Sequence, residues 1–291
     1  MKYYLGVDGG GTKTEFVWAN EKDEVIHREI HGSSNPNDIG KDRMIADMVA
    51  AVLENIPADC NRVDDCMGLS GLGFAGCKDE LVNALKKIEK VGFVDICSDV
   101  QIALDSAYDG DGCIVIMGTG SVGYLRKNGE HILVGGCGYM IDSSLSGYDL
   151  GREVLNAVCS ECDGRGERTF LTELIVKDKS GTVSELVKNT YVQGKAYVAS
   201  FAPYVFEAYM HGDKVAEEIL SRRVREWENL IWGVHKAYGE EHCEITLIGG
   251  LSRQWDILSK YLSKAIKEKI SFKIFNSSVV FGALKRAKGI H

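Results

Sequence analysis

Two glycine-rich turns, each set between short apolar strands, constrain the fold of this chain more than any other feature. The first turn, Gly9–Thr12, joins strands predicted at 3–7 and 14–18, and a third strand follows after a polar turn. The same order of strand, glycine turn, strand, turn and strand returns about 110 residues later, around 118–121, and this period is too long for a solenoid. We therefore predict an α/β protein made of two similar halves.

Helical periodicity fills the segments between these strands. Apolar residues recur at helical spacing over 44–56, and most of 148–239 is expected to be helical. Asp213 is a good N-cap for a long amphipathic helix in that region. A further strand over 244–248 leads into Gly-Gly, and a helix is predicted near 254–269.

The sequence Asp-Gly-Asp-Gly at 109–112 divides the chain between the two halves. We place an N-terminal domain at 1–109 and a C-terminal domain at 110–291 on this basis. As an alternative within this division, the final helix, 278–291, packs back on the N-terminal domain.

Composition excludes several classes of partner. The chain has 34 Lys and Arg against 42 Asp and Glu, a net charge of −8, so we expect it to bind neither nucleic acid nor an anionic membrane. No apolar run approaches the roughly 18 residues of a membrane span, and the N-terminus lacks signal-peptide features. We expect a cytoplasmic protein whose nine cysteines are reduced. The CxxC pair Cys159 and Cys162 has no second pair, which favours free thiols over structural zinc.

Both glycine turns have the composition of an anion-binding nest. Glycine lets the backbone approach a phosphate closely, and successive N–H groups then donate to it. Neither turn has P-loop spacing, and a single such hairpin is more often a plain turn. Two matching turns, with Gly249 and Gly250 after a third strand, favour nucleotide binding. Lys13 either reaches a phosphate or is a solvated lysine at a strand edge.

Two aspartates at strand ends are candidates for chemistry. Asp8 either holds Mg²⁺ through water or bonds its own turn. Asp99 ends one strand and begins a helix, so helix N-capping alone would explain it. It could equally be a general base that takes a proton from a hydroxyl attacking phosphorus, because the carboxyl ends of strands face the ligand crevice in α/β sheets.

The order of these motifs resembles that in N-acetylglucosamine kinases and the related BadF-type ATPases of the actin, hexokinase and acetate kinase superfamily. The resemblance covers nearly the whole chain. It rests on LGVDGGGTKTEF at 5–16, SSN at 33–35, ICSDVQIAL at 96–104, IVIMGTGS at 114–121, the helical segment 199–220, ITLIGGLS at 245–252 and FGAL at 281–284. No motif is decisive alone, but their order and spacing are specific.

The resemblance implies two ribonuclease-H-like domains, an actin/hexokinase-like ATPase clamshell with a helical insertion in the second domain. It implies transfer of the γ-phosphate of Mg-ATP to the 6-hydroxyl of N-acetylglucosamine, N-acetylmuramic acid or glucosamine. Because members of the family commonly form homodimers, it also implies a homodimer. Asp99 would take the hydroxyl proton, and Asp8 would hold Mg²⁺. The residues expected around ATP are Gly10, Gly11, Thr12, Lys13, Thr119, Gly120, Gly249 and Gly250. Those expected around the sugar are Asn35, Ser70, Gly71, Asp99, Gly118, Thr119, Gly138 and Asp142.

One stretch departs from the family pattern. The family has a glycine-tryptophan-glycine turn and then a GDEGS-like sequence, whereas this chain has Gly136-Cys137-Gly138 and then Ser143 and Ser144 in place of the acid pair. The sugar contact of the family aspartate is therefore lost or moved to Asp142. Two alternatives follow: a non-catalytic sugar sensor, or an ATPase that activates a partner enzyme through an iron–sulfur cluster. The intact Asp99 argues against the sensor, and the CxxC pair does not resemble the cluster ligands.

Overall fold

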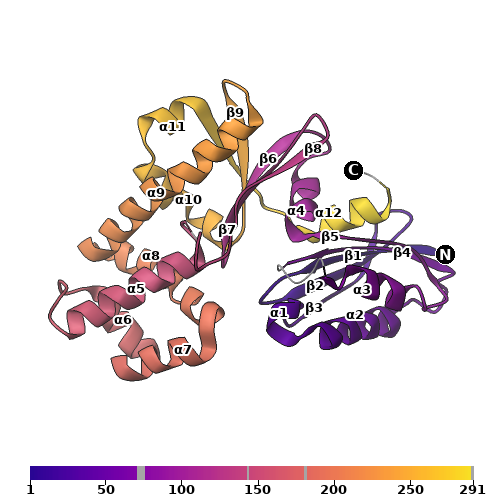
Figure 1. Ribbon diagram of the computed structural model, residues 1–291, viewed down its shortest axis with the longest axis horizontal. Coiled ribbons are helices and arrows are strands. Elements are labelled where there is room, and N and C mark those ends of the chain that lie inside the picture. Colours follow the sequence, from indigo (N-terminus) through magenta and orange to yellow (C-terminus); the bar gives the residue numbers. More distant parts are fainter. Residues whose placement is uncertain (71–75, 143, 180–181, 290–291) are drawn as a thin grey trace. The chain divides into compact units, whose positions relative to one another are not determined.

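The computed structural model describes residues 1–70, 76–142, 144–179 and 182–289 and divides into two compact units (Figure 1). Unit 1 consists of Met1–Asp111 together with Asn276–His291, and unit 2 is Gly112–Phe275. The last helix therefore belongs to unit 1 and not to the C-terminal unit, because its apolar face packs on the sheet of unit 1.

Unit 1 is built on a five-stranded mixed sheet in the order β3-β2-β1-β4-β5. The strands are β1 (Lys2–Gly9), β2 (Thr14–Asn20), β3 (Val25–His31), β4 (Arg62–Leu69) and β5 (Val91–Ser98). The first three form an antiparallel meander, and β1, β4 and β5 are parallel. The carboxyl ends of β1, β4 and β5 thus meet at one edge, where a ligand crevice is expected in such sheets.

Helices cover both faces of this sheet. One face carries α1 (Pro36–Ile39), α2 (Lys41–Asn55) and α3 (Lys78–Leu85), and the other carries α4 (Asp99–Ala107) and α12 (Val280–Ala287). The second layer depends on two glycines, since a Cβ at Gly6 would lie 2.8 Å from the Val280 carbonyl oxygen, and a Cβ at Gly282 only 1.9 Å from that of Ile102. Close approach of α12 to both β1 and α4 therefore requires glycine at these positions.

Unit 2 repeats the plan of unit 1. Its sheet has the order β10-β9-β6-β7-β8, with β6 (Gly112–Met117), β7 (Ser121–Lys127), β8 (Glu130–Gly135), β9 (Cys243–Ile248) and β10 (Ile270–Ile274). Again a meander of three antiparallel strands is followed by two strands parallel to its first member. The two sheets match strand for strand, which confirms the predicted duplicated α/β fold.

Helices make up most of the chain between β8 and β9. They are α5 (Gly147–Cys162), α6 (Phe170–Lys179), α7 (Val183–Ala199), α8 (Ala202–Met210) and α9 (Lys214–Tyr238). Asp213 caps α9 by accepting a hydrogen bond from the backbone N–H of Ala216 at 2.7 Å, and Gly239 ends it in the left-handed conformation. Trp227 on α9 is fully buried in the core of unit 2. Across the described residues, no helix is long and apolar enough to cross a membrane.

The single helix predicted over 254–269 is wrong. The segment contains a 3₁₀ turn, η2 (Gly250–Gln254), the short helix α10 (Trp255–Leu258), a second 3₁₀ turn, η3 (Ser259–Tyr261), and α11 (Lys264–Lys269). The break occurs at Leu262, whose backbone is extended, and Ser263 then restarts the helix by accepting from the Ile266 N–H. Serine competes for backbone hydrogen bonds in this way, and apolar periodicity alone does not reveal it.

Candidate active site

The first glycine turn of unit 1 is a tight hairpin that presents its backbone to solvent. Gly10 donates its N–H to the Lys13 carbonyl oxygen at 2.9 Å, and Gly11, Thr12 and Lys13 are exposed. A Cβ at Gly9 would lie 2.5 Å from both Leu69 Cδ2 and Ser34 Oγ, so a larger residue there would have to displace both side chains. The four residues predicted to contact ATP in this unit therefore lie together in one accessible turn.

Two neighbouring segments are tied to this turn by backbone hydrogen bonds. Ser34 N–H donates to the Gly10 carbonyl oxygen at 3.2 Å, and Ser70 N–H donates to that of Gly9 at 2.8 Å. Asn35 accepts from the Asn37 N–H and so caps α1. The predicted sugar residues Asn35 and Ser70 thus lie beside the predicted phosphate turn, whereas Gly71 lies outside the described residues.

Two serine hydroxyls beside the turn are buried without a hydrogen-bond partner in the described structure. They are Ser34 Oγ, on a side chain only 3% exposed, and Ser70 Oγ. A buried polar group without a partner costs about 1–3 kcal/mol, so such groups mark places where a polar ligand is expected.

Three carboxylates gather at the base of the hairpin. Asp8 on β1 lies directly opposite Glu15 on β2. Burial, followed by the negative charges of Asp99 and Glu15, raises the pKa of the Asp8 carboxyl to about 6. Glu15 is itself 3% exposed, pairs with Arg28 at 2.6 Å, and accepts a hydrogen bond from the Ser278 hydroxyl at 3.0 Å. The cluster is therefore strongly attractive to a cation.

Asp99 is the first residue of α4, and the N-cap is Ser98. The N-cap role considered for Asp99 is therefore wrong. Ser98, the last residue of β5, occupies the N-cap position, and Asp99 already lies inside the helix. The backbone N–H of Val100 donates to Asp99 Oδ1 at 2.9 Å, while the Gln101 side chain accepts from Ser98 N–H.

The second glycine turn, in unit 2, is held by the start of a helix. Gly118 N–H donates to the Gly120 carbonyl oxygen at 2.9 Å. The carbonyl oxygens of Gly118 and Thr119 accept from the first two N–H groups of α5, those of Gly147 and Tyr148, at 2.8 and 3.1 Å. The predicted phosphate residues of unit 2 are thus fixed by α5.

Gly249 packs directly against this second turn. Its φ is +112°, and a Cβ there would lie 2.6 Å from the Met117 carbonyl oxygen, so both conformation and space require glycine. Gly250 begins η2 immediately afterwards, and both glycines are exposed. Because β6 and β9 are parallel neighbours, the predicted nucleoside motif and the second phosphate turn share one end of the sheet.

The stretch that departs from the family pattern forms a compact loop after β8. Gly136 and Gly138 have positive φ, and the carboxylate of Asp142 accepts from the Gly136 N–H at 2.8 Å. Asp142 is half-buried, and its N–H donates to the Gly138 carbonyl oxygen. This aspartate therefore shapes the loop that contains the predicted sugar residue Gly138. Ser143 lies outside the described residues.

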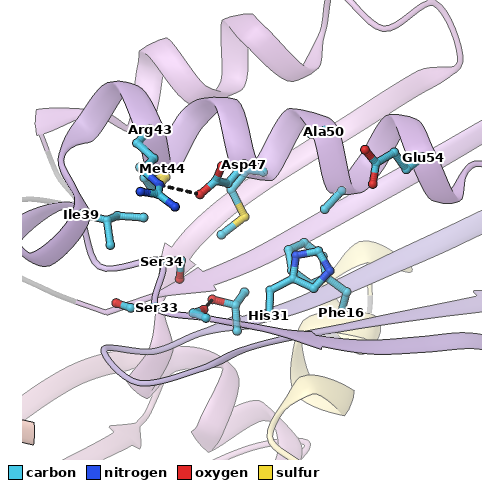
Figure 2. Close-up of a pocket in the computed structure, with 14 residues that line it drawn as sticks. Phe16, His31, Ser33, Ser34, Ile39, Arg43, Met44, Asp47, Ala50 and Glu54 are labelled. Atoms are coloured by element: carbon cyan, nitrogen blue, oxygen red, sulfur yellow. Dashed lines mark hydrogen bonds and ion pairs between the residues drawn. The ribbon is translucent and has the colours of Figure 1, made fainter.

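A cavity of about 410 Å³ in unit 1 lies between α2 and the strands β2 and β3 (Figure 2). Ser33 and Ser34 reach it from the loop beside the glycine turn, and Arg43 and Asp47 of α2 form an ion pair at 3.5 Å above it. Neither Asp8 nor Asp99 lines this cavity. It is therefore separate from the carboxylate cluster.

A model of one protein family matches a range of the chain that includes both glycine turns. The model of the BadF/BadG/BcrA/BcrD ATPase family matches residues 5–284. The chain belongs to this family. Among its relatives, an N-acetylmuramic acid/N-acetylglucosamine kinase from Clostridium acetobutylicum is 28% identical, over 98% of this chain and 97% of the relative. An N-acetyl-D-glucosamine kinase from Dictyostelium discoideum is 30% identical, over 91% and 90%.

Solved structures agree on the fold of this BadF-type ATPase. A Chromobacterium violaceum protein provisionally named an N-acetylglucosamine kinase superposes with a TM-score of 0.78 at 23% identity, over 99% of both chains. The two duplicated sheets thus have the actin/hexokinase-like ATPase fold, as the resemblance implied.

Sequence reasoning missed several residues that shape the BadF-type site. Glu15 was one of them, although the hairpin register could have placed it opposite Asp8. Two others are Asp149 and Arg223, which form a buried ion pair at 3.1 Å, while Asp149 also accepts from the Leu145 N–H. This pair anchors the end of the 136–146 loop to α5 and α9, and no local signal in the sequence joins residues so far apart.

Proposed function

We propose that this protein is an ATP-dependent kinase that transfers the γ-phosphate to the 6-hydroxyl of an amino sugar, N-acetylglucosamine or a close relative. The observation that carries the proposal is a pair of carboxylates at one sheet edge, Asp8 and Asp99, beside an exposed glycine hairpin. The two are close enough that, after burial, the charge of Asp99 helps to raise the pKa of Asp8. The names of its relatives support the substrate class, since two of them are kinases of N-acetylglucosamine.

Asp99 is proposed as the general base. Phosphoryl transfer asks a protein mainly for positioning and charge neutralisation, and a carboxylate is sufficient to accept the proton of the attacking hydroxyl. The backbone of Asp99 is fixed because the residue lies in the first turn of α4. The Val100 N–H donates a hydrogen bond to one of its carboxylate oxygens. The Asp99 carboxylate would then accept the proton of the sugar hydroxyl.

The glycine turns are proposed to hold ATP. Gly10, Gly11 and Thr12 of unit 1 would donate backbone N–H groups to the phosphates, and Lys13 would add a point charge. In unit 2, Thr119 and Gly120 would do the same, and Gly249 with Gly250 would pack against the nucleoside. These assignments are supported by the exposure of the first turn, by the partial exposure of Gly118, Thr119 and Gly120 in the second, and by the close packing around Gly9 and Gly249.

The carboxylate cluster fits a Mg²⁺ ion. Hard carboxylate oxygens are its preferred protein ligands. Burial, followed by the negative charges of Asp99 and Glu15, raises the pKa of Asp8 to about 6, and a bound cation would favour the ionised carboxylate. Asp8 would hold the ion, through water, with Glu15 and Asp99 nearby. When bound with ATP, Mg²⁺ neutralises charge on the phosphates.

The sugar is proposed to contact Asn35, Ser70, Gly71, Gly118, Thr119 and Asp99, with Gly138 and Asp142 at the altered loop. Asp142 already accepts from a backbone N–H within its loop, so one of its oxygens is engaged there. We propose that the serines at 143 and 144 relax selection at this end of the sugar, so that N-acetylmuramic acid and glucosamine are candidates beside N-acetylglucosamine. Cytoplasmic location and a homodimer remain predictions.

A panel of amino sugars in a coupled assay of ADP release tests the proposal. Asp99→Asn should lower kcat at least a hundredfold while ATP still binds, because the proton acceptor is lost and the phosphate turns are intact. Asp42→Asn, an exposed carboxylate on α2, is the matched control and should keep full activity. Sugar binding without ADP release would favour a non-catalytic sugar sensor. A kinase should be colourless, so a brown protein that contains iron would favour an ATPase that activates a partner enzyme.

A further inference from the structure

Two thiols and a carboxylate meet in unit 1, on the face of the sheet covered by α4 and α12. Cys66 lies on β4, and Asp95 and Cys97 lie on the adjacent strand β5, with Cys66 directly opposite Asp95. The two sulfur atoms are 4.0 Å apart, and Cys66 Sγ is 3.7 Å from Asp95 Oδ2. Among the described residues, this is the place where three metal-ligating side chains converge, with all three ligand atoms within 4.8 Å of one another.

The two separations measured from Cys66 Sγ fit a tetrahedral cation. With metal–sulfur bonds of about 2.3 Å and a metal–oxygen bond of about 2.0 Å, tetrahedral angles put the two sulfurs about 3.8 Å apart and sulfur and oxygen about 3.5 Å apart. The observed distances exceed these by about 0.2 Å each, an amount that small side-chain rotations supply. Main-chain pairing of β4 with β5 fixes the positions of all three ligands before any cation arrives.

The charges around the cluster favour a divalent ion. Arg286 of α12 donates to Asp95 Oδ2 at 2.8 Å and to Asp105 Oδ2 at 2.9 Å. Two carboxylates and one guanidinium sum to −1 when both thiols are neutral. A divalent cation that replaces the two thiol protons leaves this sum at −1, whereas a monovalent cation would leave −2 in a buried site, which is costly.

Burial and ligand type separate this cluster from the ATP site. Cys66 is fully buried and Cys97 is 6% exposed, beneath the small side chains Ala283 and Ala287 of α12. Thiolates select borderline-soft cations, whereas Mg²⁺ prefers oxygen ligands. A cation here would not compete for the magnesium that accompanies ATP.

We propose that Cys66, Cys97 and Asp95 form a binding site for one thiophilic divalent cation, with Zn²⁺ as the expected ion. The ion fastens β4 to β5 two residues before Asp99. Its binding exchanges two thiol protons for the cation and involves no change of oxidation state. The site therefore supports the sheet edge and takes no part in phosphoryl transfer.

The test uses the full chain, reduced and free of nucleotide. Titration of Zn²⁺ against a chromophoric chelator should give one equivalent per chain, and Co²⁺ in its place should show thiolate-to-metal charge-transfer absorption. Cys66→Ser with Cys97→Ser should abolish both signals. Cys60→Ala, a matched buried cysteine of unit 1 that is 3% exposed, should keep both, and so should Cys162→Ser in the exposed CxxC pair.

A second variant keeps the proposal testable if the double serine variant does not fold. Asp95→Asn should weaken Zn²⁺ binding by about tenfold or more and keep the charge-transfer absorption, because both thiolates remain. Three results would overturn the proposal: no saturable Zn²⁺ binding by the unaltered chain, Co²⁺ binding without charge-transfer absorption, or loss of the one bound equivalent of Zn²⁺ in the Cys162→Ser variant.

Discussion

Asp65 of β4 is a buried carboxyl group in unit 1 whose effect on stability can be tested directly, because no group in the described structure donates a hydrogen bond to it. The residue has no solvent exposure, and neither carboxyl oxygen has a hydrogen-bond partner. It lies opposite Leu5 of β1 and Val94 of β5, within an apolar core. Burial, and then the charge of Asp64, raise the pKa of Asp65 well above its ordinary value.

Replacing this carboxyl should stabilise the protein. Asp65→Val, close in volume and suited to a strand, removes an unsatisfied buried polar group worth about 1–3 kcal/mol even when neutral. An acid whose folded pKa is raised contributes stability below its unfolded pKa and loses it as pH rises, at about 1.4 kcal/mol per pH unit from about pH 4 up to the folded pKa. The advantage of Asp65→Val should therefore grow between pH 5 and pH 7.

Urea unfolding of both proteins at pH 5, 6 and 7 measures this difference. A separate thermal melt at pH 7 should show a higher melting temperature for Asp65→Val, by about 2–4 °C for each kcal/mol gained. Asp64→Val is the matched control and should destabilise, because Asp64 pairs with Lys2 at 2.7 Å and with Arg62 at 2.8 Å. A less stable Asp65→Val variant, or an advantage that does not change with pH, would refute the reasoning.

Three further predictions concern the site and its support. Because the Asp8 pKa is raised to about 6, kcat/KM for Mg-ATP should fall roughly tenfold per pH unit below pH 6, and Asp8→Asn should remove this dependence; a flat profile down to pH 5 would contradict it. Gly249→Ala should lower stability by about 1–3 kcal/mol, measured by thermal unfolding, whereas Gly250→Ala should be tolerated since nothing lies within 4 Å of its Cβ position. Gly282→Ala should destabilise unit 1 by about 1–3 kcal/mol, because its Cβ overlaps the Ile102 carbonyl; unchanged urea unfolding would argue against that packing.

The fold could be predicted from the sequence because its signals are local and repeated. Each glycine turn lies between short strands, and the two copies together indicate a duplicated sheet. Asp8 and Asp99 could be selected as candidates because both lie within one residue of a strand's carboxyl end, before a turn or a helix. Their catalytic and metal roles remain predictions.

The parts that could not be predicted depend on pairing between distant segments. Opposite placement of Cys66 and Asp95 follows from the register of β4 with β5, and no nearby residue encodes it. The same holds for Asp149 and Arg223, which are 74 residues apart in the chain. Glu15 is different, since its position opposite Asp8 follows from the length of a single hairpin.

The return of the chain to unit 1 after β10 has a consequence for folding during synthesis. Residues 276–291 are translated after all of unit 2, yet α12 completes the apolar layer over β1 and α4. Unit 2, which is continuous, can therefore reach its final packing on the ribosome before the unit that precedes it. Until α12 emerges, that face of the first sheet is covered by α4 alone, and the apolar surface that α12 will bury stays open to solvent.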